Sequence, residues 1–92
     1  MRKYAKLSLW SDQQRESLVD VARKAFAKTK CHDATSLAWI LRDLTENGAL
    51  VWDDYKPTHR KTFHIIASDL LDHIERQGLV VRESSGWYRR RQ

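Results

Sequence analysis

The stretch "ASDLLDHIERQGLVVRESSGWYRR", residues 67–90, contains the end of a helix, a stop signal and a tight hairpin. Gly78 follows the helical pattern at the position where a residue of positive φ commonly ends a helix. Residues 79–82 and 87–90 are short β-prone runs, and Gly86 can supply the positive φ that the loop between them needs. The sequence therefore predicts a helix that leads directly into a β-hairpin.

The helix before this hairpin has the most regular pattern in the chain. Its apolar residues recur at helical spacing and form one continuous face: Phe63, Ile66, Ala67, Leu70, Leu71 and Ile74. Because Pro57 disfavours helix at the residue before it, the helix is predicted from about Thr58 or Lys61 to Gln77. A hairpin alone is marginally stable, so we expect it to pack on this helix and on a third strand, for which residues 49–52 are the candidate.

Two further helices are predicted upstream. The first spans about Asp12–Lys28, with Ser11 as its N-cap and Gln14 as the capping-box partner that would bond back to Ser11. The second spans about residues 34–47. Three helices and one small antiparallel hairpin make the predicted fold class mostly α with a minor β component, an α+β fold.

The second helix has Asp33 as its predicted N-cap, Gly48 at its left-handed end, and an apolar stripe. The stripe consists of Leu37, Ile40, Leu41 and Leu44. Trp39 projects from the opposite face, so it is exposed, covered by the N-terminal segment with Tyr4 and Trp10, or held in an interface. Packing within its own chain is the interpretation that the sequence favours.

The composition is that of one globular domain: 92 residues, 41% hydrophobic and 32% charged. No apolar run approaches the ~18 residues of a membrane helix, and the first residues lack the apolar core of a signal peptide. We therefore expect no membrane partner and a cytoplasmic or, in a eukaryote, nuclear location. The single Cys31 fits a reducing compartment, and its spacing from the histidines matches no zinc pattern. Without a Gly-rich phosphate loop or a convincing nucleophile with a base, we expect no cofactor and no enzymatic activity.

Charge is unevenly distributed around the net value of +5. Residues 1–30 carry eight basic and three acidic side chains, residues 31–55 carry one and five, and residues 56–64 carry three and none. The last of these segments covers the predicted start of the third helix. A concentrated basic segment at a helix start favours a polyanionic partner.

The order of helix, glycine, apolar pair, basic residue, polar loop and basic return strand resembles the winged helix-turn-helix superfamily over residues 66–90. The resemblance implies a single winged-helix-like three-helix domain over residues 1–92, with residues 1–10 as an N-terminal arm. In that family the helix before the hairpin usually enters the major groove, and the hairpin, or wing, touches backbone or minor groove. It therefore implies duplex DNA as partner, for a transcriptional regulator or a replication or recombination accessory factor.

The residues expected to contact DNA follow from the resemblance and from local charge. The resemblance places Arg82 and residues 89–91 on the flanks of the wing and residues 84–86 at its tip. At the start of the third helix, cationic and hydrogen-bonding side chains can meet phosphates or base edges. The expected set is Lys56, Arg60, Lys61, His64, Ser68, Arg82, Arg89, Arg90 and Arg91.

The remaining elements of that family leave two arrangements open. Its short strand between the first two helices is hard to place in residues 29–32, and about ten to thirteen residues separate Asn47 from the third helix. Either the extra strand follows the second helix, or the helix-turn-helix lies wholly within residues 57–77, with a very short second helix.

A second class of function also fits the sequence. Trp39, Ile65 and the acidic "WDDY" segment at residues 52–55 suit a protein partner. Asp69 and Asp72, on the solvent face of the third helix, would repel phosphate. The alternative prediction is a protein-interaction module, a subunit or small inhibitor acting on a larger assembly. Trp39 is also the candidate seam of a homodimer.

Overall fold

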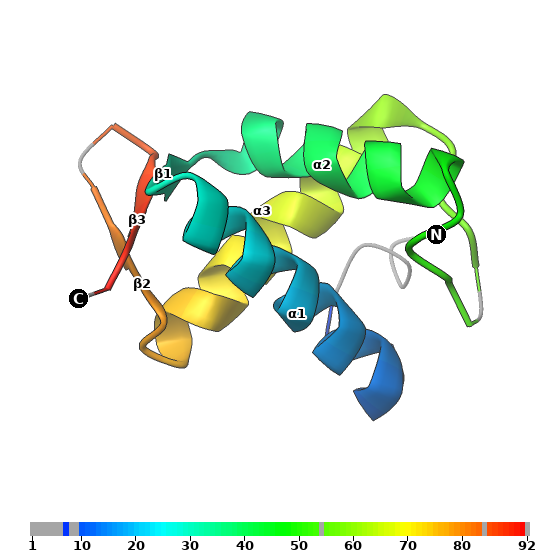
Figure 1. Ribbon diagram of the computed structural model, residues 1–92, viewed down its shortest axis with the longest axis horizontal. Helices are drawn as coiled ribbons and strands as arrows, with labels where there is room; N and C mark the ends of the chain where they lie inside the picture. The colour runs from blue at the N-terminus through cyan, green and yellow to red at the C-terminus, as the bar shows by residue number, and fades with distance from the viewer. Residues whose placement is uncertain (1–6, 8–9, 54, 84, 92) are drawn as a thin grey trace.

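The order of the elements is helix, strand, helix, helix, strand, strand (Figure 1). The computed structural model describes residues 7, 10–53, 55–83 and 85–91. Its elements are α1 (Asp12–Lys28), β1 (Cys31–His32), α2 (Ala34–Glu46), α3 (Arg60–Arg76), β2 (Val80–Arg82) and β3 (Tyr88–Arg90). The predicted class, mostly α with a small antiparallel β component, is confirmed. The helices begin and end within a few residues of their predicted bounds.

Side-chain caps explain where the first two helices begin. The Ser11 hydroxyl accepts a hydrogen bond from the backbone N–H of Gln14 (N···O 3.1 Å), as predicted. The Asp33 carboxylate accepts from the backbone N–H of Ser36 at 2.8 Å, and the Ser36 hydroxyl returns to the Asp33 N–H, which completes a capping box. Both caps satisfy backbone donors that the first turn of a helix leaves without partners.

The predicted capping-box role of Gln14 is wrong. Its side chain is only 2% exposed and turns away from the helix start. The amide Nε2 donates to the carbonyl of Val51 at 3.2 Å, and Oε1 accepts from the backbone N–H of Asp53 at 2.8 Å. Because backbone polar groups that approach a core need partners, Gln14 serves the connection between α2 and α3 instead of its own helix.

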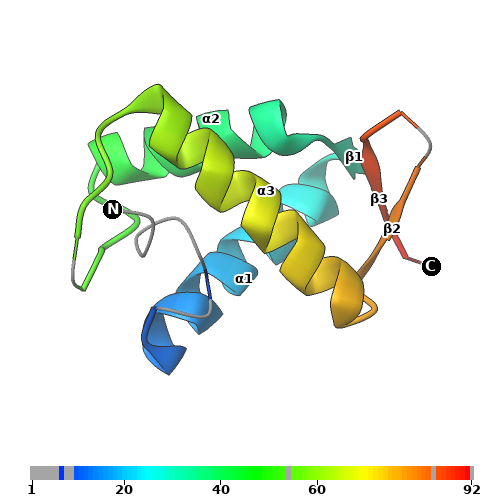
Figure 2. The same ribbon diagram turned by 180° about the vertical axis from the view of Figure 1, so that it is seen from behind.

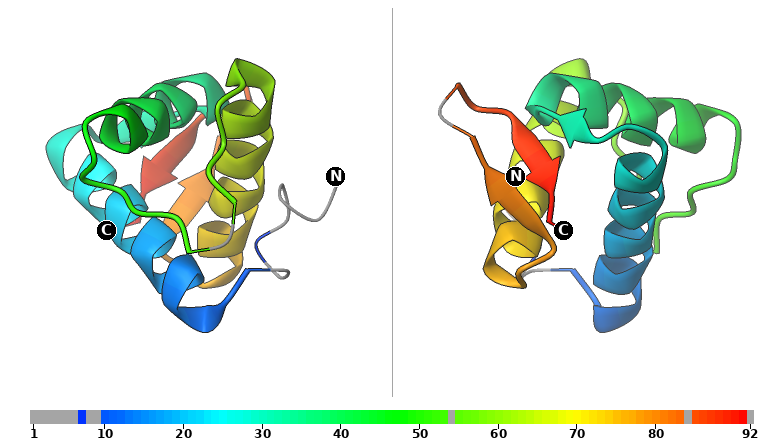
Figure 3. Two further views of the ribbon diagram at one scale, coloured as in Figure 1. Left: turned by 90° about the vertical axis from the view of Figure 1, so that its right-hand side faces the viewer. Right: turned by 60° about the vertical axis from the view of Figure 1, so that its left-hand side comes forward.

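The sheet has the order β1-β3-β2, with antiparallel pairing throughout. Its third strand is Cys31–His32, so the prediction that residues 49–52 supply it is wrong. The connection after α2 lies at the opposite end of the molecule from the sheet: in the left-hand view of Figure 3 it runs in the foreground, with the sheet behind the helices. Both open arrangements also fail, because the extra strand precedes α2, and α3 runs uninterrupted from Arg60 to Arg76, which leaves no helix-turn-helix within the fully described residues 57–77.

A single core lies where the three helices meet. The predicted apolar face of α3 is confirmed, since all six of its residues are buried. In α2, Leu37 and Leu41 are fully buried, whereas Ile40 and Leu44 are only partly covered. Of the predicted N-terminal arm, the structure describes Leu7 and Trp10, and both are buried. Burial of one such large side chain contributes about 1.5 to 3 kcal/mol, so these contacts supply most of the stability.

Candidate nucleic-acid interface

The basic residues of segment 56–64 lie exposed at the start of α3. Lys56, Arg60, Lys61 and His64 are all exposed. Among the described residues, no carboxylate pairs with Arg60 or Lys61. The N-cap His59 makes no side-chain capping bond, and the first turn of α3 holds no acidic residue. Cations at a helix N-terminus add to the positive end of the helix dipole, so the potential here favours an anion.

Further along α3, the solvent face changes from basic to neutral. His64, Ile65 and Ser68 are exposed, and Ile65 retains 51% of its surface. Figure 2 shows α3 in the foreground, with α1 behind it and the hairpin at its C-terminal end. The N-terminal half of α3 therefore carries exposed basic and polar side chains that can contact a nucleic-acid groove.

The two aspartates of α3 are engaged within the fold. Asp69 Oδ2 accepts a hydrogen bond from the backbone N–H of Leu7 at 2.5 Å, and Asp72 Oδ1 accepts from the Tyr88 hydroxyl at 3.1 Å. Both carboxylates are partly buried. The sequence showed their charge but not these bonds. They hold the N-terminal segment and the hairpin against α3, and both lie beyond the basic first turns.

The Tyr88–Asp72 bond sets the position of the hairpin relative to α3. Tyr88 is buried, and the Arg82 guanidinium lies 5.6 Å from the centroid of its ring. Burial raises the pKa of the Tyr88 phenol above its ordinary value, and the hydrogen bond to Asp72 raises this pKa further. A neutral phenol that donates to a carboxylate is therefore the stable state at neutral pH.

The arginines of the hairpin do not share one direction. Arg89 pairs with Val81 and Cys31 across the sheet, so its side chain lies on the outer face. There its Nε donates to Glu83 Oε2 at 2.6 Å, which offsets part of its charge. Arg90 reaches toward the end of α1, where Nη1 lies 3.4 Å from the Phe26 carbonyl oxygen.

At the tip, Gly86 has φ of +87°, as predicted. Trp87 is 41% exposed there, and Arg91 is exposed beyond β3. Ser84, the first residue of the predicted tip, lies outside the described residues. The exposed side chains of the hairpin thus include Arg82, Trp87, Arg90 and Arg91, whereas Arg89 is half-buried.

A cleft of about 400 Å³ separates the N-terminal half of α2 from the first turns of α3. Its lining combines an aromatic ring, small or apolar groups and basic groups: Thr35, Ala38, Trp39, Arg42, Arg60, Lys61, Phe63 and His64. Trp39 is 50% exposed. The favoured prediction is that the N-terminal segment covers Trp39. The Trp10 ring packs on Trp52 instead, with 5.2 Å between the ring centroids, and Tyr4 lies outside the described residues. Sequence spacing gave no sign that Trp39 and Arg60 would share one cleft.

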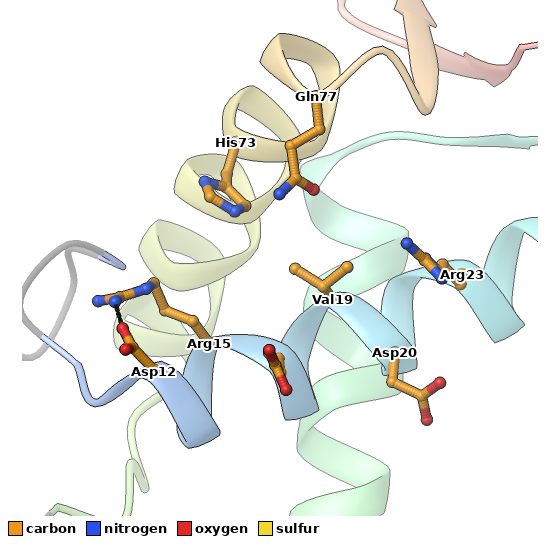
Figure 4. A pocket seen from close by; sticks show the side chains of 8 residues that line it. Asp12, Arg15, Val19, Asp20, Arg23, His73 and Gln77 are labelled. Carbon is orange, nitrogen blue, oxygen red and sulfur yellow. Dashed lines mark hydrogen bonds and ion pairs between the residues drawn. The ribbon is translucent and has the colours of Figure 1, made fainter.

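A second cleft, about 640 Å³, lies between α1 and the C-terminal half of α3 (Figure 4). His73 and Gln77 extend from α3 toward α1, and Arg15 forms an ion pair with Asp12. The three carboxylates of Asp12, Glu16 and Asp20 outnumber the two arginines there, so the charge of this cleft does not favour a polyanion. Within the described ranges, no three histidine, cysteine or carboxylate side chains are grouped to hold a metal ion.

The arrangement brings together only part of the residue set expected from the sequence. Arg60, Lys61, His64 and Ser68 lie in the first three turns of α3 and Lys56 lies in the connection before it, whereas the hairpin arginines divide between two directions. Among the described residues, no helix combines the length and apolar character needed to cross a bilayer. Comparison with protein-family models, curated protein sequences and solved structures finds no match to this chain.

Proposed function

We propose that this chain is a winged-helix protein that binds duplex DNA through α3 and the hairpin. The observation that carries the proposal is the exposed start of α3, where Arg60, Lys61 and His64 gather without a carboxylate partner among the described residues. The strand β1 between α1 and α2 and the hairpin after α3 support it, since the family has a strand and a wing at these positions, although the connection between α2 and α3 is longer than the family's short turn. A fold alone does not determine function, so the proposal rests on the positive charge of the site itself.

In this proposal α3 enters the major groove by its N-terminal half. The groove is ~12 Å wide and admits a helix. Arg60 and Lys61 contact phosphates at its rim, while His64 and Ser68 face base edges, and Ile65 is placed to touch a thymine methyl. The wing contacts the neighbouring backbone through Arg82 and Arg91. Arg89 contributes less, because Glu83 already offsets its charge.

The test is to map the bound surface by NMR. Duplex DNA of mixed sequence at ~50 mM salt, where phosphate contacts are strong, is titrated into the labelled protein. The expected shift changes lie in the first three turns of α3 and in the hairpin. Changes confined to the solvent face of α1, or no changes at all, would refute the proposal.

A second candidate function is a protein-interaction module. The specific observation is the exposure of Trp39, Ile65 and Trp87, three large apolar side chains that soluble partners often cover. A homodimer through Trp39 is its simplest form. Sedimentation of wild type and Trp39→Asp tests that form: a dimer that becomes a monomer supports it, and two monomers at micromolar concentration contradict it.

A further inference from the structure

The cleft between α2 and α3 combines two properties that ordinary solvent-exposed grooves rarely share. It holds a large aromatic ring with half of its surface exposed, and its other exposed charged residues are basic. None of its lining residues in the described part of the chain is a carboxylate. Its volume of about 400 Å³ lies within the ~300 to 1,000 Å³ typical of small-molecule sites. A ligand that fits must therefore be anionic and must offer a flat surface.

Trp39 has exposed ring surface for such a ligand. The Arg42 guanidinium lies 5.4 Å from the centroid of the ring and covers one face, while Arg42 Nε bonds to Glu46 at 3.1 Å. The Glu46 carboxylate offsets part of the guanidinium charge. Trp39 nevertheless remains 50% exposed, so part of its ring is open to a planar group.

The anionic requirement comes from α3. Arg60 and Lys61 line the same cleft and have no ion-pair partner in the part of the chain that the structure describes. Their charges lie beside the first backbone N–H groups of α3, at the positive end of the helix dipole. A phosphate held there would lie close to a planar group stacked on Trp39.

We propose that this cleft binds one unpaired nucleotide, with its base stacked on Trp39 and its phosphate at Arg60 and Lys61. The inference rests on the proposed function for its context: the same two cations hold the duplex, so a strand that leaves the duplex end passes the cleft. The protein would then prefer a duplex with a single-stranded overhang to a blunt duplex. Nucleotides fit better than an acidic peptide because every nucleotide carries both a flat ring and a phosphate.

The experiment compares a blunt duplex with the same duplex carrying a short thymidine overhang. Wild type is expected to bind the overhang about fivefold to hundredfold more tightly, the range of one base stacked on an aromatic side chain. Trp39→Ala should remove this gain and leave blunt-duplex affinity unchanged. Trp39→Phe should retain part of it. Trp87→Ala, the matched loss of an exposed tryptophan on the hairpin, should change both affinities by one factor and preserve their ratio.

Fluorescence gives an independent readout. The overhang should quench tryptophan emission in wild type, and this quenching should be lost in Trp39→Phe. Circular dichroism of each variant checks that the fold is retained, as expected for a half-exposed residue.

The outcomes separate this inference from the proposed function. If wild type shows no overhang preference, or if the preference survives Trp39→Ala, the cleft proposal is wrong while duplex binding stands. If blunt duplex is not bound but single-stranded DNA is bound through Trp39, the cleft proposal stands and the duplex function fails. Equal weakening of both substrates by Trp39→Ala also contradicts the cleft proposal. The cleft proposal is also contradicted if an acidic peptide quenches Trp39 emission while neither the blunt duplex nor the overhang duplex binds.

Discussion

Replacement of both Arg60 and Lys61 by alanine removes the two cations at the start of α3 that have no carboxylate partner among the described residues. Each phosphate contact contributes about 0.9 to the slope of log affinity against log salt concentration. Loss of two contacts should therefore reduce the magnitude of the slope by about 1.8. Between 50 and 200 mM salt, the double variant should lose about twelvefold less affinity than wild type.

The assay is fluorescence anisotropy of a labelled blunt duplex, titrated at several salt concentrations within this range. Arg23→Ala/Lys24→Ala is the matched control, because it removes the same net charge from α1, which lies in front of α3 in Figure 1 and behind it in Figure 2. The control should leave the slope nearly unchanged. An equal change in both double variants would mean that net charge, and not the α3 site, governs binding. An unchanged slope in Arg60→Ala/Lys61→Ala would refute the reasoning outright.

Three further predictions concern the fold that carries the site. Leu70→Ala, at a fully buried position, should lower the free energy of unfolding by about 2 to 5 kcal/mol in urea titrations, and an unchanged midpoint would contradict the packing of α3. Gly86→Val should strain the hairpin loop, because φ there is +87°, a value that a β-branched residue rarely adopts. The strain would come from the backbone alone, since an added Cβ would meet no atom within 4 Å. Its NMR shift changes should be confined to residues 79–90, and wild-type shifts throughout that range would count against the loop geometry. Tyr88→Phe should lower stability by about 1 to 2 kcal/mol at neutral pH through loss of the bond to Asp72. Since the folded-state pKa of Tyr88 is raised, its contribution is complete below the unfolded pKa near 10 and is lost as pH rises through the folded pKa. The stability difference between wild type and Tyr88→Phe should thus narrow above about pH 10, and a constant difference to pH 11 would argue against this pKa shift.

Sequence reasoning located the helices because each has a local cause. Ser11 and Asp33 cap helix starts, Gly78 ends α3, and apolar spacing marks the buried faces. By contrast, Cys31–His32 has no alternation that could identify a strand. These residues form β1 only because β3 leaves one edge open beside them.

The parts of the site that sequence did not reveal depend on contacts between distant segments. Local sequence predicts Gln14 as a capping partner, whereas in the fold its amide bonds to the backbone of the connection after α2. The Arg89–Glu83 pair requires the hairpin loop to close. Trp39 and Arg60 belong to different helices, and only the α2–α3 packing places both in one cleft. Local patterns do not encode any of these distances.

The central place of β3 in the sheet has a consequence for the order of folding. The β2–β3 hairpin is local and can close early, but β1 joins the same strand from a segment far away in the chain. Long-range pairings form late because their loops must close first. A truncation that removed Tyr88–Arg90 would therefore abolish both pairings at once and leave three helices without a sheet. Mutations in β3 should slow the folding of the three-stranded sheet, whereas mutations in β1 should mainly speed the unfolding of that sheet.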